Sequence, residues 1–341
     1  MAHSLIAKTT DGHLLTAAEA EELMEILLGG FAETAEIVGL LAALNSRPYR
    51  AEELAGFARA MRRRATRVFA PEEPLPGRLV DTCGTGGDDA GTFNISTAAA
   101  IVASAAGARV AKHGNRAASS KSGSADVLET LGVRLDLPFD VVGRAIREIG
   151  IGFLFAQAAH TAMRYVMPAR RQIGVRTVFN LLGPLTNPAD ARTQVLGVFS
   201  ADVVDVVAET LAKLGAEHAL VVHGSGQLDE VSLAGPTLVA EVRDGSVRLF
   251  AVSPEDFGVD RAPLECVQGG TAKENAGIVQ SVLAGELGPC HDIVAINAAA
   301  ALVVVGVARN FREGTQLARE AIESGAAERK LAALVSFGTD E

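Results

Sequence analysis

Beyond residue 77, short apolar runs alternate with segments of helical periodicity. Strands are predicted at 78–81, 109–112, 151–155, 194–198 and 219–222. Helical segments such as 201–214 lie between them. This alternation is typical of a mostly parallel sheet flanked by helices, with ligand-binding loops at the carboxyl ends of the strands. The chain is therefore predicted to contain an α/β fold.

The first 70 residues show a different pattern. Apolar residues recur there at helical spacing, as Leu23 and Leu27 do. The proline-rich stretch 70–77 cannot continue a helix, so it predicts a boundary between a small helical domain at 1–74 and a larger α/β domain at 75–341. With 48% hydrophobic and 21% charged residues, a chain of 341 residues can bury a core of the required size.

A glycine-rich loop follows the first predicted strand. Its residues 84–88 read GTGGD, and three glycines in four positions let backbone N–H groups converge on an anion without a Cβ clash. The residues Asn94-Ile95-Ser96-Thr97 then precede an alanine-rich helix, whose N-terminus attracts phosphate. Capping of that helix by Asn94 and Ser96 is the alternative, because caps and anion sites use the same residue types.

A second polar loop follows the next predicted strand. It opens with KHGNR at 112–116, where Lys112 and Arg116 add positive charge, and continues with hydroxyls up to Ser124. By composition alone such a Ser/Gly run is typical of a linker, but its place between a strand and a helix favours phosphate contact. Neither GxxxxGK[ST] nor a GxGxxG with its acidic partner is present, which argues against nucleotide hydrolases and dinucleotide dehydrogenases.

Two further segments carry candidate functional groups. Asp229-Glu230 follows the predicted strand 219–222 and suits Mg²⁺, which takes one or two carboxylates together with substrate phosphates, although an Asp-Glu pair is usually a solvated loop. The segment from His160 through Tyr165 to Arg170 offers a guanidinium fork for a planar carboxylate, with two rings that could flank an aromatic substrate.

Together these segments resemble the anthranilate phosphoribosyltransferases, which join anthranilate to phosphoribosyl pyrophosphate in tryptophan biosynthesis. The resemblance rests on GTGGD at 84–88, TFNIST at 92–97, KHGNRAASS at 112–120, GSADVLETLG at 123–132 and RTVFNLLGPLTNP at 176–188. Leu228-Asp229-Glu230 and the ENA of 274–276 extend it over nearly the whole chain.

The resemblance implies two sets of substrate contacts. Those to phosphoribosyl pyrophosphate would be Gly84, Gly87, Asp88, Thr92, Asn94, Ile95, Ser96, Thr97, Lys112, His113, Gly114, Asn115, Arg116, Ala117, Ala118, Ser119, Ser120 and Ser124. Those to anthranilate would be Gly84, Asn115, His160, Tyr165 and Arg170, with Arg170 on the carboxylate.

The resemblance also implies two Mg²⁺ ions in each monomer, one at Ser96 on the pyrophosphate and one at Asp229 and Glu230. It further implies a homodimer formed through the helical domain, to which a later segment at about 168–192 would be added. Three positions depart from the family pattern. Asp89 and Gln227 stand where glycine is frequent, and Thr161 stands where proline often follows the histidine.

The expected chemistry needs no dedicated catalytic residue. Pyrophosphate leaves as Mg²⁺ and preorganised donors stabilise its charge, the ribose carbon becomes oxocarbenium-like, and the neutral aromatic amine attacks without prior deprotonation. His113 is a candidate base, but a hydrogen-bonding wall is the better interpretation of a histidine beside a phosphate loop. The rival functions are a pyrimidine nucleoside phosphorylase and a non-catalytic nucleic-acid-binding relative.

Several functional classes are disfavoured by composition. A net charge of −10 argues against nucleic-acid binding, and the clustered Arg62, Arg63 and Arg64 are interpreted as a solvated helix face. The apolar stretch 293–308 is interrupted by Asn297 and is too short for a membrane helix, so it predicts a buried one. Three widely spaced cysteines and the absence of a signal-peptide pattern predict a cytoplasmic protein without membrane partners.

Overall fold

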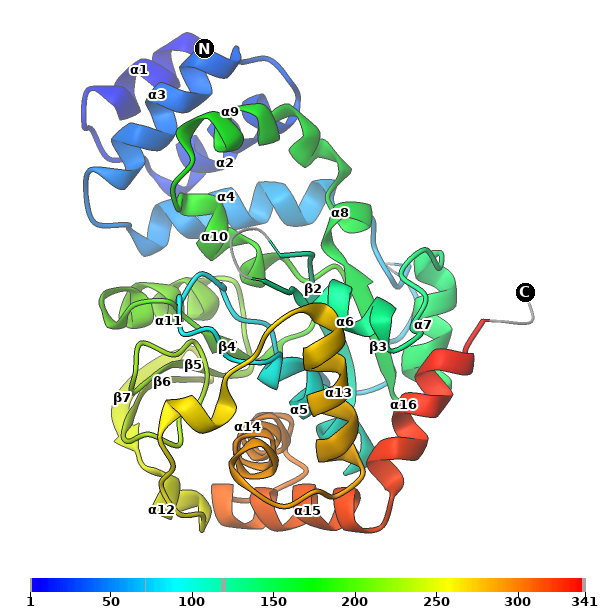
Figure 1. Ribbon diagram of the computed structural model, residues 1–341. Helices are drawn as coiled ribbons and strands as arrows, with labels where there is room; N and C mark the ends of the chain where they lie inside the picture. The colour runs from blue at the N-terminus through cyan, green and yellow to red at the C-terminus, as the bar shows by residue number, and fades with distance from the viewer. Residues whose placement is uncertain (1, 71, 118–120, 339–341) are drawn as a thin grey trace.

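The computed structural model describes residues 2–70, 72–117 and 121–338. A helical domain sits over one edge of a larger α/β domain, and the chain passes between them more than once (Figure 1). This matches the predicted fold class. None of the helices in the described part of the chain has the length and hydrophobicity needed to cross a bilayer.

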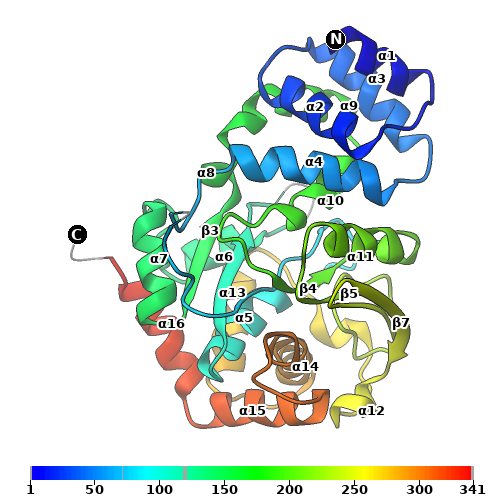
Figure 2. The same ribbon diagram turned by 180° about the vertical axis from the view of Figure 1, so that it is seen from behind.

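The helical domain combines segments from two parts of the chain. It contains α1 (Ala2–Thr10), α2 (Ala17–Leu28), α3 (Thr34–Asn45), α4 (Ala51–Arg64), η1 (Thr161–Tyr165), α9 (Met167–Ile173), α10 (Val178–Leu182) and η2 (Pro184–Thr186). Leu23 and Leu40 from the first group share one core with Ala169 and Phe179 from the second. Figure 2 shows the later segment rising from the sheet into the helices and returning.

Local signals explain the packing of α2 and α4. Thr16 and Glu19 form a capping box that begins α2, with Thr16 N donating to the Glu19 carboxylate over 2.8 Å. A Cβ on Gly56 would overlap the backbone of α2, so this glycine allows α4 to pack closely against it. The basic residues at the end of α4 do not simply face solvent, because Arg63 and Arg64 form ion pairs with Glu25 of α2.

The sheet has seven strands in the order β3-β2-β1-β4-β5-β6-β7. They are β1 (Leu79–Asp81), β2 (Arg109–Gly114), β3 (Ile151–Phe155), β4 (Thr193–Gly197), β5 (His218–Gly224), β6 (Thr237–Arg243) and β7 (Ser246–Val252). The first five are parallel and correspond to the five predicted strands. The antiparallel hairpin β6–β7 was not predicted, although its turn Asp244-Gly245, with both residues at positive φ, is a common hairpin signal.

Helices cover both faces of the sheet. They are α5 (Ile95–Ala105), α6 (Ser124–Thr130), α7 (Phe139–Glu148), α8 (Ala156–Ala159), η3 (Ala201–Val203), α11 (Val204–Lys213), α12 (Pro254–Phe257), η4 (Leu264–Val267), α13 (Ala272–Leu283), α14 (Pro289–Val305), α15 (Phe311–Glu323) and α16 (Ala326–Ser336). Successive residues of β5 face opposite sides of the sheet: Leu220 belongs to the core that contains α14, and Val221 belongs to the core that contains α11.

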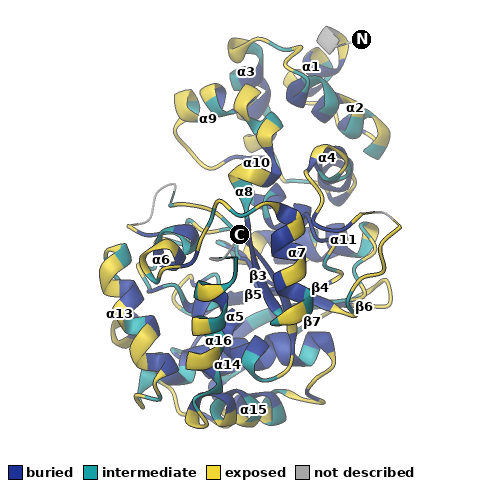
Figure 3. Cartoon of the chain, turned by 90° about the vertical axis from the view of Figure 1, so that its right-hand side faces the viewer, coloured by how far each residue is buried: buried dark blue, intermediate teal, exposed yellow. Residues whose placement is uncertain are grey.

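The predicted buried helix is α14. Thirteen of its seventeen residues are buried, and the polar Asn297 is one of them. Figure 3 shows the same contrast across the molecule: α14 and the inner strands are buried, whereas α13 and α15 are exposed along their outer faces and the edge strand β7 is largely exposed. The fold therefore places the carboxyl ends of five parallel strands on the edge that faces the helical domain (Figure 1).

Candidate active site

The glycine loop after β1 packs against the acidic loop after β5. Thr85 N donates to Gly197 O over 2.9 Å, and Gly86 N donates to Asp229 Oδ2 over 2.8 Å. A Cβ on Gly84 would lie 2.6 Å from Asp229 Oδ2, and one on Gly197 would overlap the Asp229 carbonyl. Two motifs about 140 residues apart in sequence are thus held in contact by glycines that allow close approach.

Three carboxylates meet at this contact. Asp229 N donates to Asp88 Oδ2 over 3.3 Å, and Ser96 N donates to Glu230 Oε1 over 3.1 Å. Burial, followed by the nearby Asp88 carboxylate, raises the pKa of Asp229 to about 7. Burial and Asp229 raise the pKa of Glu230 as well. The site therefore concentrates negative charge that a cation would relieve.

This arrangement fits magnesium bound jointly with a substrate. Within the described ranges there is no group of three or more His, Cys, Asp or Glu side chains arranged to hold a metal ion. Mg²⁺ does not need such a cage, because it commonly takes one or two carboxylates and completes its octahedron with phosphate oxygens and water. A small cavity lined by Thr82, Ser96 and Glu230 lies beside these groups.

Lys112 is buried beneath the start of α5. Its Nζ donates to Thr82 O over 3.0 Å and to Ser96 Oγ over 3.3 Å. Burial lowers the pKa of Lys112, and the Asp81 carboxylate opposes that shift. Lys112 thus fixes the Ser96 hydroxyl and adds positive charge near Glu230.

The residues that open α5 do not behave as a simple helix cap. Asn94 occupies the N-cap position without a side-chain capping bond. Its Nδ2 donates to Ser122 O over 3.3 Å, and its Oδ1 accepts from Asn275 Nδ2 over 2.9 Å. The capping alternative for Asn94 is therefore wrong. Ile95 is buried in the core, so only its backbone is available to a ligand.

Two more predicted contacts lie close to Asn94. Thr92 pairs with Gln268 in an isolated antiparallel bridge. Thr97 is buried, and its Oγ1 has no hydrogen-bond partner in the described structure. An unpaired buried hydroxyl next to a helix N-terminus is suited to donate to an anionic ligand.

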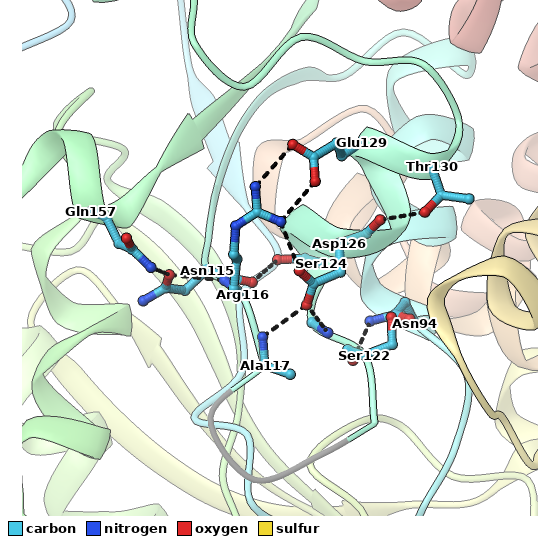
Figure 4. A network of polar contacts seen from close by, with 11 residues as sticks. Asn94, Asn115, Arg116, Ala117, Ser122, Ser124, Asp126, Glu129, Thr130 and Gln157 are labelled. Carbon is cyan, nitrogen blue, oxygen red and sulfur yellow. Dashed lines mark hydrogen bonds and ion pairs between the residues drawn. The ribbon is translucent and has the colours of Figure 1, made fainter. Parts of the chain in front are cut away.

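The second loop is organised around Asp126 of α6 (Figure 4). Asp126 Oδ2 accepts from Ala117 N over 3.0 Å and from Gly123 N over 2.9 Å. Arg116 pairs with both Glu129 oxygens, at 2.7 and 2.9 Å, and with Asp126, so its charge is directed to α6 (Figure 4). The predicted contacts Ala118, Ser119 and Ser120 lie outside the described residues.

Asn115 and Ser124 close the base of this loop. Ser124 Oγ donates to Asn115 O over 3.3 Å, and Gln157 Nε2 donates to Asn115 Oδ1 over 3.2 Å (Figure 4). A Cβ on Gly114 would overlap Ser124 Oγ, so glycine is needed at the end of β2. These predicted residues are therefore in mutual contact.

Arg170 has the features expected of a carboxylate-binding arginine. Its guanidinium lies 5.5 Å from the centre of the Phe179 ring, and it has no ion-pair partner within 2–70, 72–117 and 121–338. Burial lowers the pKa of Arg170, with no compensating acidic neighbour. A partly buried, unpaired guanidinium gains from binding an anion.

His113 and His160 form a pair of neutral rings. Their centroids are 5.3 Å apart, and His160 Nε2 lies 3.4 Å from Thr186 Oγ1. Burial lowers the pKa of His113 to about 3, helped by His160, while a hydrogen bond with the Gly183 backbone opposes the shift. Burial also lowers the pKa of His160 to about 4. A group with a pKa of about 3 is a weak base, which agrees better with a wall than with proton transfer.

Tyr165 has different surroundings. Its ring packs against Gly30 of the helical domain, and its hydroxyl accepts from Arg164 Nη2 over 2.8 Å. It is 40% exposed. The contacts of Tyr165 thus connect it to the helical domain rather than to the two histidines.

Two of the three departures from the family pattern, Asp89 and Gln227, fall in loops, and the third, Thr161, begins η1. Asp89 has φ 58° and Gln227 has φ 64°, so both occupy the left-handed region that glycine adopts without cost. Asp89 accepts from Arg176 Nη2 over 3.1 Å. Thr161 is exposed at the start of η1, where nothing in the structure requires proline.

Sequence reasoning missed several buried groups that hold these loops. Asp81 accepts from His113 N over 3.1 Å and from Asn187 Nδ2 over 2.8 Å. Asn297 binds the backbone of Val231 in both directions, each bond 2.9 Å long, and so fixes the residue that follows Glu230. A polar residue inside an otherwise apolar helix was the available signal for Asn297.

Comparison with known proteins gives a consistent result. Residues 76–328 match a family model described as the glycosyl transferase family a/b domain, and residues 3–65 match the helical bundle domain of the same family. Anthranilate phosphoribosyltransferase from Symbiobacterium thermophilum is 51% identical over 334 residues, which cover 98% of this chain and 97% of the relative.

Solved structures agree. Anthranilate phosphoribosyltransferase from Thermus thermophilus superposes with a TM-score of 0.91 at 48% identity, covering 98% of each chain. The Saccharomyces cerevisiae enzyme, solved in complex with PRPP and Mg, gives a TM-score of 0.89 at 29% identity, covering 100% of this chain and 99% of that one.

Proposed function

The chain belongs to the anthranilate phosphoribosyltransferase family. We propose that it binds its two substrates at the carboxyl ends of the parallel strands, where the sheet faces the helical domain. The reaction transfers the phosphoribosyl group of phosphoribosyl pyrophosphate to the amine of anthranilate, giving N-(5-phosphoribosyl)anthranilate and pyrophosphate, a step of tryptophan biosynthesis. The contact between the glycine loop and Asp229 is the observation that carries the proposal, because it joins an anion-binding backbone to a cation-binding carboxylate.

The donor would bind between the glycine loop, the start of α5 and the loop after β2. Its contacts are proposed to be Gly84, Gly87, Asp88, Thr92, Asn94, the backbone of Ile95, Ser96, Thr97, Lys112 to Ser120, and Ser124. Support comes from the unpaired Thr97 hydroxyl and from the converging N-terminus of α5.

We propose two magnesium ions, one at Ser96 and one at Asp229 and Glu230. The bond from Ser96 N to Glu230 supports this pairing, because it brings the two positions together. Bound Mg²⁺ would neutralise charge that develops on the leaving pyrophosphate. The S. cerevisiae relative, solved with PRPP and Mg, supports the use of the metal.

Anthranilate would lie near Arg170, His160, Asn115 and Gly84. The unpaired guanidinium of Arg170 supports its role at the carboxylate, and the neutral imidazole of His160 supplies a polar ring surface. Tyr165 is proposed to border this region from the helical side. The chain's own residues then act by holding the amine against the ribose carbon, so that positioning and electrostatics supply the rate enhancement.

We also propose that the domains meet at residue 74/75, with 168–192 added to the helical domain, and that this domain forms a homodimer. Leu14, Phe31 and Val175 support the dimer, because all three are large, exposed apolar residues of the helical domain. The cytoplasm is proposed as the location, since the three cysteines are free thiols.

A direct assay tests the function. Mixing the protein with anthranilate, phosphoribosyl pyrophosphate and Mg²⁺ should cause loss of anthranilate fluorescence that a chelator prevents. Thymidine with inorganic phosphate, offered in parallel, should give no thymine, and a labelled oligonucleotide should not bind. Folded protein that leaves anthranilate unchanged would overturn the proposal.

A further inference from the structure

A segment near the start of α13 lies along the glycine loop. Gly269 N donates to Gly91 O over 2.8 Å, and Phe93 N donates to Val267 O over 3.2 Å. A Cβ on Gly269 would lie 2.6 Å from the backbone of Phe93, so glycine permits this close contact. The segment 267–270 therefore contacts residues 91–93 at the end of the loop, whereas Asp229 contacts its beginning at Gly84 and Gly86.

Asn275, in the first turn of α13, extends this contact to Asn94. Its side chain is buried, with 2% of its surface exposed. Its Oδ1 accepts from Gly270 N over 2.7 Å, and its Nδ2 donates to Asn94 Oδ1 over 2.9 Å. Asn94 Nδ2 in turn donates to Ser122 O over 3.3 Å.

Backbone groups at both ends of this series of hydrogen bonds fix which atom of each asparagine amide donates and which accepts. The Gly270 N–H can only donate, so it must face the oxygen of Asn275, and the amide nitrogen of Asn275 must then face Asn94. The Ser122 carbonyl can only accept, which selects the same orientation of Asn94. One N–H of Asn94 remains for a further acceptor.

We propose that Asn275 is a positioning residue that holds the Asn94 amide with its N–H side toward the phosphoribosyl donor. The inference rests on the proposed function, in which Asn94 contacts that donor. An amide turned the other way would present oxygen to an anion and repel it. Asn275 itself touches no substrate and acts through Asn94.

The charged groups near Asn275 do not take over its hydrogen bond to Asn94. Glu274 is turned back to Thr271, whose N–H and hydroxyl donate to it over 2.7 and 2.8 Å. The basic residues near this turn are Lys121, which interacts electrostatically with Glu274, and Lys273, which is exposed on α13. The Asn94 Oδ1 atom therefore accepts its hydrogen bond from the neutral amide of Asn275.

The test replaces Asn275 with aspartate. The new carboxylate, when ionised, accepts from Gly270 but has no hydrogen for Asn94, whereas its protonated form restores the original donor pattern. For N275D, the KM for phosphoribosyl pyrophosphate should rise roughly tenfold to hundredfold at about pH 8, while the KM for anthranilate stays within about twofold. The deficit, measured as the ratio to wild type at each pH, should shrink as pH falls toward about 5.5.

A matched control is Q280E, which makes the same charge change on the exposed face of α13 and should leave both KM values unchanged. A deficit in N275D that ignores pH, or equal losses in both KM values and kcat, would overturn the proposal. Inactive wild-type protein would instead overturn the proposed function.

A second measurement tests the proposal in case N275D is too unstable to assay. Donor binding is measured by calorimetry for N275A, N94A and the double variant. Loss of the same interaction predicts that the double variant binds no more weakly than N94A. Additive losses would contradict an action of Asn275 through Asn94.

Discussion

The guanidinium of Arg176 lies 3.1 Å from the Asp89 carboxylate and joins the segment returning from the helical domain to the glycine loop. The Arg176 carbonyl accepts from Asn45 of α3 over 2.6 Å, and its side chain lies over the Phe199 ring at 5.0 Å. One residue thus contacts α3, the loop after β4 and the proposed donor site.

Replacing Asp89 with glycine should strengthen donor binding. The change removes a negative charge beside the proposed pyrophosphate site and frees Arg176, so the KM for phosphoribosyl pyrophosphate should fall about two- to threefold in low salt. Stability should change by less than about 1 kcal/mol, because relief of the left-handed φ offsets loss of an exposed ion pair. D244G, at a positive φ in the distant β6–β7 turn, controls for backbone effects and should leave KM unchanged. An unchanged KM in D89G would refute the electrostatic effect.

Replacing Arg170 with alanine should weaken anthranilate selectively. Losing a charged hydrogen bond costs on the order of 2 kcal/mol, which corresponds to about a thirtyfold rise in the KM for anthranilate, with little change for the donor. The adjacent exposed Arg171 is the matched control, because R171A removes the same charge from the same helix. An equal rise in the KM values for both substrates would contradict the proposed contact between Arg170 and the anthranilate carboxylate.

Magnesium binding should compete with protonation of Asp229. Its pKa is raised to about 7 from an ordinary value of 3.8, so the stability it contributes is fully present below pH 3.8 and is lost as pH rises through 7. The ion should restore that stability, and the increase in melting temperature on adding Mg²⁺ should be larger at about pH 8 than at about pH 5.5. D229N should show a smaller increase and less pH dependence. An equal magnesium effect at both pH values would count against the site.

His113 and His160, which are both buried, should make the protein sensitive to acid. Their pKa values are lowered to about 3 and about 4 from 6.5, so their stability contribution is present above pH 6.5 and is lost as pH falls toward the lowered values. Each should add a slope of about 1.4 kcal/mol per pH unit within that window. Urea unfolding of H160Q between about pH 4 and 7 should show a shallower slope than wild type. H13Q, at an exposed position, is the control.

The parallel sheet and the loops at its edge could be predicted from sequence because strands, glycines and helix starts are local signals. Contacts between distant segments could not. Asn275 and Asn297 reach the site from helices near the end of the chain, and one sequence contains no record of such pairings. The pairing of Arg116 with Glu129, rather than with a ligand, is also a long-range choice of partner.

The strain at Asp89 and Gln227 shows the same limit. The sequence marked both as departures from a glycine pattern, but only the backbone angles show that both lie at positive φ. Tyr165 was grouped with His160 because they are near in sequence, whereas its ring packs on Gly30.

The discontinuous helical core has a consequence for biosynthesis. Leu23 and Leu40 share their core with Ala169 and Phe179, which are made only after the first three strands of the sheet. During synthesis on the ribosome, an apolar face of α2 and α3 therefore stays exposed until about half of the chain has emerged. Folding of the two domains is coupled in time, and the waiting helices are the segment most exposed to aggregation or chaperone capture.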